Sequence, residues 1–149
     1  MASFQKNIEI RWSDLDPNFH VLHSKYYDIA AYARMAFLTE HGLSTEVMKQ
    51  YHIGPILFRE ECIFKREINF GDIVTVNFML EKVSSDFSRW TMIHEIIKNG
   101  DTVAAQLTAE GAWMDTIARK IALPPKEVID IFEDAPKSNS FSVFERDKK

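Results

Sequence analysis

The sequence predicts an α+β fold in which one antiparallel β-sheet wraps around a long central α-helix. Residues 25–41 read as a helix that is apolar around most of its circumference, so other structure must cover it. Residues 4–12, which alternate with period two, precede this helix, and four strand-like runs follow it. No internal repeat or linker divides the chain, which places these strands in one sheet around one helix.

A polar loop joins the first strand to the long helix. Along residues 4–12 the even positions carry most of the apolar side chains, as in a half-buried strand. Residues 14–23 break this alternation with polar side chains and Pro17. Ser24 stands where a helix N-cap is expected, and Gly42 follows the end of the helix.

The rest of the chain supplies shorter elements. We expect a short helix at 45–51 behind Ser44, strands at 56–68, 72–83, 87–98 and 102–115, and a helix at 126–133 after two prolines. Asn99-Gly100 suits the two-residue turn of a hairpin between the last two strands. Residues 1–134 then form a single domain, and residues 135–149 form a polar tail that could be flexible.

Composition excludes several classes of function. The chain has 149 residues, of which 46% are hydrophobic, and this suits one domain with its own core. The net charge of −4 arises from interspersed acidic and basic residues, so we expect no nucleic-acid partner. No uncharged stretch reaches the roughly 18 residues of a membrane helix, so we expect no membrane partner.

The single cysteine, Cys62, bears on the compartment and on metal binding. It allows no disulfide within the chain and supplies no cluster of metal ligands, so we expect no metal site. A reducing compartment fits this usage, and we expect a cytoplasmic protein. A sheet with only one face covered by its own helix also has edges to protect, which favours a homodimer or homotetramer.

The loop before the long helix is the main candidate for chemistry. It places Asp14, Asp16, Asn18 and His20 within seven positions. The helix N-terminus beyond it presents unpaired N–H groups and a partial positive charge, which would polarise a carbonyl group. A carboxylate beside that carbonyl could attack it or could deprotonate a water that attacks it, and both routes stay open. The structural alternative is that these residues only form Asx turns.

The run from Arg11 to Val21 resembles a known signature. It is similar to that of the 4-hydroxybenzoyl-CoA thioesterase branch of the hotdog superfamily, in which D-x-D precedes H-V and a tyrosine, here Asp14-Leu15-Asp16, His20-Val21 and Tyr26. It is more similar still to the R-W-S-D-L-D-x-N-x-H-V run of plant acyl-ACP thioesterases. The resemblance covers about residues 4–133 and implies a hotdog fold.

The resemblance implies roles for four residues of this loop. Asp16 matches the catalytic carboxylate of these enzymes, and a backbone N–H near His23 would polarise the thioester carbonyl. Asn18 and His20 match further catalytic positions of the plant enzymes, although ordinary loop roles stay open for both.

Three positions of the loop depart from the family pattern. Phe19 replaces the usual glycine, and Leu22 and His23 replace two asparagines. These departures concern the shape of the substrate site rather than the aspartate itself.

Further candidates follow from the same resemblance. The plant enzymes carry a Glu-Cys pair near Glu61, which makes Glu61 a catalytic candidate, but alternation turns Glu60 inward instead, so the choice between the two stays open. Ser88 and Arg89 lie where CoA-specific relatives contact nucleotide phosphates, and Tyr26 is a third substrate-binding candidate. A salt-bridged surface glutamate and a solvated arginine are the structural alternatives.

The sequence therefore predicts a thioesterase that hydrolyses acyl-CoA or acyl-ACP to a free carboxylic acid and a thiol, with Asp16 as nucleophile or general base. Coenzyme A is part of the substrate, so no cofactor is expected, and the active site should lie near a subunit interface. Two alternatives remain. One is a non-catalytic hotdog binding or scaffold protein. The other is a hotdog acyl-CoA hydratase, whose D-x-N-P-x-H signature needs an aspartate where this chain has Leu15.

Overall fold

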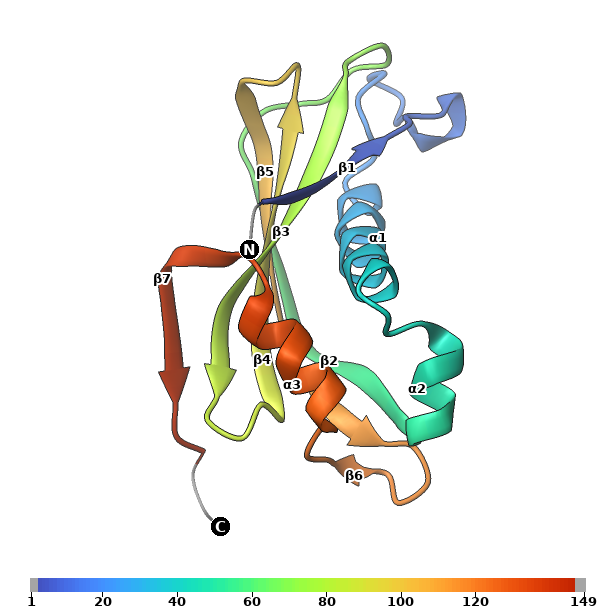
Figure 1. Ribbon diagram of the computed structural model, residues 1–149. Helices are drawn as coiled ribbons and strands as arrows, with labels where there is room; N and C mark the ends of the chain where they lie inside the picture. The colour runs from blue at the N-terminus through green and yellow to red at the C-terminus, as the bar shows by residue number, and fades with distance from the viewer. Residues whose placement is uncertain (1–2, 147–149) are drawn as a thin grey trace.

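The computed structural model describes residues 3–146 as a curved β-sheet with one long helix packed against it (Figure 1). The elements are β1 (Phe4–Ile8), η1 (Trp12–Asp14), α1 (Lys25–Glu40), α2 (Thr45–Tyr51), β2 (Ile53–Phe64), β3 (Val74–Ser84), β4 (Arg89–Lys98), β5 (Thr102–Asp115), β6 (Lys120–Ile121), α3 (Lys126–Asp134) and β7 (Lys137–Phe144). This order contains every helix and strand that the sequence predicts, together with β6 and β7, which it does not.

The strands form one sheet in the order β1-β3-β4-β5-β2. All neighbours along this path are antiparallel. Two short strands extend it, with β6 beside β5 and β7 beside β3. Strand β2 lies at one end of the path, so one of its edges has no partner strand within the described chain. The predicted antiparallel sheet around a central helix is thus confirmed.

Alternate side chains of the central strands build the core under α1. On β3, Val74, Val76, Phe78 and Leu80 are each at most 1% exposed. Phe37 of α1 stacks on Phe78, with ring centroids 4.1 Å apart. Each such side chain contributes roughly 1.5–3 kcal/mol through removal of its surface from water, which makes the helix–sheet contact the main source of stability.

The boundaries differ from expectation on both sides of the polar loop. Strand β1 ends at Ile8 rather than at residue 12, because Trp12–Asp14 turns into a short 3₁₀ helix. The N–H of Arg11 closes that turn by donating to the Asp14 carboxylate at 2.9 Å. Ser24 is not an N-cap, since its backbone is already helical and its side chain makes no capping hydrogen bond.

Helix α1 is covered on one side only within the chain. Ala30, Ala33 and Phe37 face the sheet and are fully buried, whereas Tyr32 is 48% exposed. The expectation that other structure surrounds this helix is therefore wrong for one copy of the chain. The outer face looked apolar because its residues include alanines and tyrosines, which tolerate exposure.

Three local predictions are confirmed. The turn between β4 and β5 has positive φ at both Asn99 (55°) and Gly100 (78°), as a two-residue hairpin requires. Helix α2 begins behind Ser44, whose side chain accepts a hydrogen bond from the N–H of Val47 at 3.3 Å. Helix α3 follows the proline pair as expected.

Part of the predicted tail is an ordered strand. Strand β1 pairs with the first half of β3, and β7 pairs in parallel with the second half, so β7 occupies the stretch of that edge which β1 leaves free. Lys137 fixes the junction, because its Nζ donates to the carbonyl oxygens of Glu133 at 2.6 Å and of Ala135 at 3.0 Å at the end of α3. The sequence did not predict β7, because its side chains are mostly polar and exposed and so show no alternation of apolar residues.

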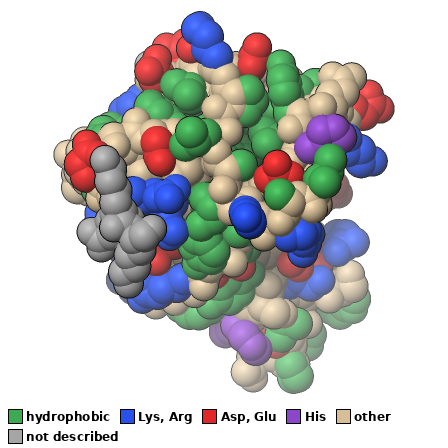
Figure 2. Space-filling view, turned by 90° about the horizontal axis from the view of Figure 1, so that it is seen from below, with side chains coloured by type: hydrophobic (Ala, Val, Ile, Leu, Met, Phe, Trp, Pro, Cys, Tyr) green, Lys and Arg blue, Asp and Glu red, His purple; other side chains and the backbone are tan. Residues whose placement is uncertain are grey.

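The surface carries charges of both signs. Figure 2 shows acidic and basic side chains interspersed with apolar ones on the face seen from below. Among residues 3–146, no helix is long and apolar enough to cross a membrane.

Candidate active site

The Asp16 loop is a tight hairpin held against the sheet. The N–H of Asp16 donates to the His20 carbonyl oxygen at 2.8 Å, and the N–H of Phe19 donates to the Asp16 carbonyl oxygen at 2.9 Å. Beyond the hairpin, the N–H of Val21 donates to the carbonyl oxygen of Ile68 at 2.8 Å. These hydrogen bonds fix the backbone of Asp16 relative to the segment between β2 and β3.

One oxygen of the Asp16 carboxylate is held by the loop and the other is not. Oδ1 accepts hydrogen bonds from the N–H groups of Asn18 at 2.8 Å and His20 at 3.2 Å. Within the described part of the chain, no group donates to Oδ2. The Asx turn of the structural alternative is therefore real, and it orients the carboxylate while leaving one oxygen available.

Asn18 and His20 contact Asp16 through their backbones. The Asn18 side chain is exposed, and its amide makes no hydrogen bond with the described residues. The His20 side chain lines the same hollow as Asp16. The structure thus brings all three residues together, with backbone N–H groups rather than side chains making the contacts.

Phe19 explains why relatives carry a glycine at this position. Its φ is 65°, in the left-handed region that glycine enters without strain. The ring is 61% exposed and lies 6.0 Å from the Trp12 ring, between centroids. The hairpin therefore keeps its shape despite the departure from the family pattern.

A hollow of about 350 Å³ opens beside Asp16. Its wall comes from the loop, the start of α1 and the segment at the end of β2, namely Asp16, His20, Val21, His23, Tyr26, Phe64, Lys65, Arg66 and Glu67. Four of the predicted site residues, Asp16, His20, His23 and Tyr26, therefore share one hollow. Lys65 and Arg66 were missed because they fall within a run that reads as continuous strand.

The turn just before α1 supplies a free hydrogen-bond donor at this hollow, the N–H of His23. His23 is exposed, and in residues 3–146 neither its N–H nor that of Ser24 donates to a protein acceptor. The N–H groups at a helix start carry partial positive charge. An oxygen atom placed against them would be stabilised as it gained negative charge.

Tyr26 forms the floor of the hollow. It is 3% exposed, and its ring packs edge-on against Phe64 with centroids 5.0 Å apart. Burial raises the pKa of Tyr26. This side chain therefore stays neutral and offers mainly apolar surface to a ligand.

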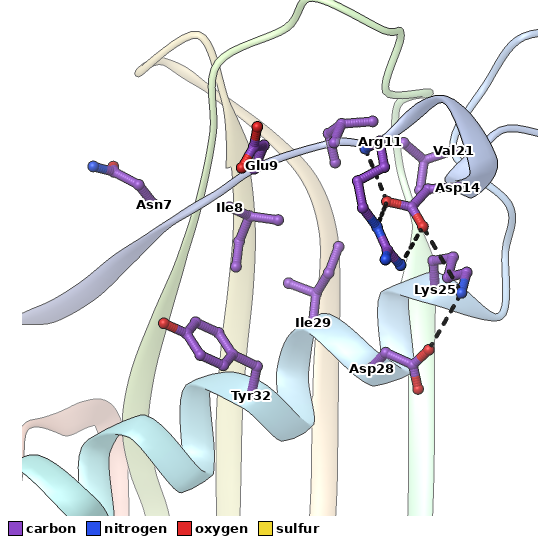
Figure 3. Close-up of a pocket in the computed structure, with 11 residues that line it drawn as sticks. Asn7, Ile8, Glu9, Arg11, Asp14, Val21, Lys25, Asp28, Ile29 and Tyr32 are labelled. Atoms are coloured by element: carbon purple, nitrogen blue, oxygen red, sulfur yellow. Dashed lines mark hydrogen bonds and ion pairs between the residues drawn. The ribbon is translucent and has the colours of Figure 1, made fainter.

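Asp14 anchors the loop and lies outside the Asp16 hollow. Its buried carboxylate pairs with Arg11 at 3.2 Å and with Lys25 at 3.8 Å (Figure 3). Burial alone would raise the pKa of Asp14, but hydrogen bonds from Arg11 and the charge of Lys25 outweigh it and lower that pKa. Asp14 instead lines a separate cavity of about 400 Å³ between β1 and α1.

Glu60 and Glu61 lie on opposite faces of the sheet. Glu60 pairs in register with Ala109, whose side chain is buried on the helix side, whereas Glu61 pairs with Thr108. Glu61 is 47% exposed and makes an ion pair of 2.7 Å with Arg59. Glu60 thus faces inward as alternation predicts, and Glu61 does not reach the Asp16 hollow of its own chain.

Ser88 and Arg89 lie at the far end of the sheet. Ser88 is fully buried and donates to the Asp86 carboxylate at 2.6 Å. Arg89 lines a different cavity, of about 480 Å³, and pairs in register with Ala112. The N–H of Lys65, a residue of the Asp16 hollow, donates to the carbonyl oxygen of Ala104, which lies on β5 like Ala112. Eight residues of strand separate these two alanines, so the Arg89 cavity lies about 25 Å from the Asp16 hollow along β5.

Comparison with known protein families assigns this chain to one of them, because the match covers most of the chain. The sequence model of the thioesterase-like superfamily matches residues 10–132, which include the whole Asp16 loop, α1 and strands β2 to β6. The chain belongs to this superfamily. A curated Aquifex aeolicus protein with a provisional esterase name is 25% identical over 126 residues, which are 84% of this chain and 94% of that protein.

Solved structures share the hotdog fold of this superfamily member. A Staphylococcus aureus protein in complex with CoA has a TM-score of 0.81 at 18% identity, over 93% of this chain and 89% of that one. A 1,4-dihydroxy-2-naphthoyl-CoA thioesterase from Synechocystis has a TM-score of 0.79 at 18% identity, over 89% of this chain and 97% of that one. At these identities the likeness concerns the fold, and the predicted hotdog architecture is confirmed.

Proposed function

We propose that this protein hydrolyses acyl-CoA thioesters and that Asp16 is its catalytic carboxylate. The observation that carries the proposal is that one hollow is lined both by an oriented carboxylate with a free oxygen and by His23, whose N–H just before α1 has no acceptor among the described residues. A nucleophile or base opposite an oxyanion site is what acyl transfer from a thioester requires.

The reaction would begin with the thioester carbonyl oxygen against the N–H of His23. In one route Oδ2 of Asp16 attacks the carbonyl carbon and expels the thiolate, and water then hydrolyses the mixed anhydride. In the other route Asp16 takes a proton from a water, which adds to the carbonyl, and the tetrahedral intermediate expels the thiolate, which takes that proton back from Asp16. Both routes give one carboxylic acid and one thiol. Neither needs Glu61, which points away from the hollow.

Basic residues at the hollow favour a phosphate-bearing leaving group. Lys65 and Arg66, from the segment that follows β2, line the hollow together with His20 of the Asp16 loop and with His23. Coenzyme A carries phosphates at the far end of its thiol arm, and cationic side chains bind these well. The S. aureus neighbour in complex with CoA supports the same choice. Acyl carrier protein, suggested by the sequence of the loop, is the second candidate.

We also propose that two copies complete the site through the free edge of β2. Phe58, Ile63 and Phe64 of this edge strand are each about half exposed, which is costly for a monomer. Antiparallel pairing of β2 with its own copy is self-complementary. It would set the Phe64 end of one copy beside the Phe58 end of the other, and so bring the Arg89 cavity toward the Asp16 hollow.

The deciding experiment compares the wild type with Asp16→Asn on short, long and aromatic acyl-CoAs and on one acyl-ACP. Asn keeps the shape of Asp but can neither attack nor act as a base, so kcat should fall by about 10²–10⁴. Asp28→Asn, an exposed aspartate in the first turn of α1, is the matched control and should retain activity. Equal activity of wild type and Asp16→Asn would overturn the assignment, and failure on every thioester would favour the scaffold alternative.

The interface has its own test. Ile63→Asp places a charge on the outer edge-strand surface, and it should convert a dimer to a monomer in light scattering and lower kcat/KM at the same time. A wild-type monomer with full activity would contradict the shared site.

A further inference from the structure

Two rows of side chains face each other between the Asp16 hollow and the middle of the sheet. One row follows α1 at four-residue spacing, so its members share a helix face. The other follows alternate positions of β2 on the helix side. The helix row is Tyr26, Ala30 and Arg34, and the strand row is Phe64, Cys62 and Glu60.

The rows contact each other at both ends and carry small side chains in the middle. Tyr26 packs edge-on against Phe64 at the hollow, and an Arg34 nitrogen lies 3.7 Å from a Glu60 oxygen at the other end. Between these contacts each row has a small residue, alanine or cysteine. Phe64 is 51% exposed and the Glu60 side chain 28%, so the strand row is only partly covered. An acyl chain that extends from the Asp16 hollow toward Glu60 would therefore lie along the side chains of Phe64 and Cys62.

Arg34 is held in place by a buried histidine. Its Nη1 lies 3.3 Å from Nε2 of His94, and Nδ1 of His94 lies 2.8 Å from the Asn77 carbonyl oxygen. Arginine can only donate, so Nε2 accepts and Nδ1–H donates, which defines one neutral tautomer. Burial and the neighbouring Arg34 charge lower the pKa of His94 to about 3, which keeps this tautomer neutral.

This arrangement leaves hydrogen-bonding capacity unused. The guanidinium has five N–H donors, and among the described residues it makes one hydrogen bond, to His94. At 3.7 Å the Glu60 carboxylate is an ion-pair partner but is beyond normal hydrogen-bond length. The Arg34 side chain is 9% exposed. The Glu60 side chain is 28% exposed, and a partly solvated ion pair with loose geometry gains little stability for the fold, so a role toward a ligand accounts for it better.

We propose that Arg34 and Glu60 bind a hydroxyl group on the acyl chain of the substrate, which makes them specificity-determining residues for hydroxylated acyl groups. The inference rests on the proposed hydrolysis of acyl thioesters. A hydroxyl oxygen between the two side chains accepts from Arg34 and donates to Glu60. A carboxylate would be repelled by Glu60, and an ammonium group by Arg34, so a neutral group that both donates and accepts is the ligand that fits.

The spacing sets the position of the hydroxyl. Eleven residues separate His23 from Arg34, which is about 16 Å along the helix axis. The arginine side chain leans back toward the N-terminus and shortens this by a few Å. A fully extended chain advances about 1.2 Å per bond, so the hydroxyl lies roughly ten to thirteen bonds from the carbonyl carbon. That distance exceeds one aromatic ring and indicates an aliphatic chain.

The test compares pairs of thioesters that differ only in the hydroxyl. The substrates are decanoyl-, dodecanoyl- and tetradecanoyl-CoA and their ω-hydroxy derivatives. The variant is Arg34→Met/Glu60→Leu, which replaces both charges together because removal of Glu60 alone leaves the buried Arg34 without its ion-pair partner. Glu40→Leu is the control, since it also breaks an ion pair of α1, 2.9 Å to Lys6, but at the C-terminal end of the helix.

The wild type should favour the hydroxylated member of at least one pair by about tenfold in kcat/KM. The double variant should lose this preference while it still hydrolyses the plain chain, and the control should keep it. Equal rates for both members of every wild-type pair would overturn the inference and leave the thioesterase proposal intact. If no thioester reacts, binding of the free acids still tests whether the hydroxyl group is recognised. In a thermal unfolding experiment, ω-hydroxydodecanoate should raise the Tm more than dodecanoate does. Equal Tm shifts would then overturn it.

Discussion

The N–H of Asn18 lies 2.8 Å from Oδ1 of Asp16, so the backbone of Asn18, not its amide, holds the candidate catalytic carboxylate. Asn18→Ala keeps this N–H. We expect its kcat to stay within about threefold of wild type, measured on whichever acyl-CoA reacts fastest. A loss as large as that of Asp16→Asn would instead show that the amide side chain takes part in the chemistry.

Gly111 is required by the close approach of β2 and of the Trp90 ring to the backbone of β5. A Cβ atom there would collide with the Ile56 carbonyl oxygen and with the Trp90 ring. Gly111→Ala should lower the free energy of unfolding by about 3 kcal/mol or prevent folding. Gly54→Ala in β2 is the control, because its Cβ would lie 3.6 Å from the nearest atom, in Thr116. Denaturant unfolding that gave the two variants the same stability would contradict this reading.

Lys137 caps the end of α3. Its Nζ donates to three carbonyl oxygens at the end of this helix, those of Phe132, Glu133 and Ala135, at distances down to 2.6 Å. Lys137→Met should cost about 1–2 kcal/mol of unfolding free energy. Lys126→Met removes only an exposed ion pair to Asp130, and should cost at most about 0.5 kcal/mol. The comparison is made by urea denaturation, and equal losses would show that the cap is unimportant.

His94 should make stability fall as the pH falls from about 6.5. Its folded pKa is about 3, lowered by burial and by Arg34, whereas an unfolded histidine titrates near 6.5. Below pH 6.5 the unfolded chain therefore binds a proton that the folded chain does not, and the free energy of unfolding falls by up to about 1.4 kcal/mol per pH unit. The contribution is complete above pH 6.5.

The pH effect is measured as the slope of unfolding free energy between pH 6.5 and 5. His94→Gln should flatten this slope whatever its effect on stability at pH 7. Acidic groups with lowered pKa, such as Asp14 and Asp72, act at lower pH and lie outside this window. An unchanged slope in His94→Gln would mean that the histidine is protonated in the folded protein.

Local patterns predicted most of the fold. Alternating side chains located the strands, and Asn99-Gly100 located the hairpin between β4 and β5, because turns with positive φ at both positions need such residues. The same alternation turned Glu60 rather than Glu61 toward the helix. Alternation failed for β7, whose polar residues are placed by pairing with the free half of β3 and not by a buried face.

The sequence by itself determined the Asp16 loop, because the residues that shape it are close together along the chain and contact one another locally. Only the tertiary structure decided which distant residues share the hollow. Lys65 and Arg66 reach it because strand β2 ends beside the start of α1. Arg34 meets Glu60 and His94 because one face of α1 packs against the sheet between strands β2 and β4. Such contacts depend on how helices and strands pack against one another. The periodicity of a single sequence predicts each helix or strand but not which of them come into contact.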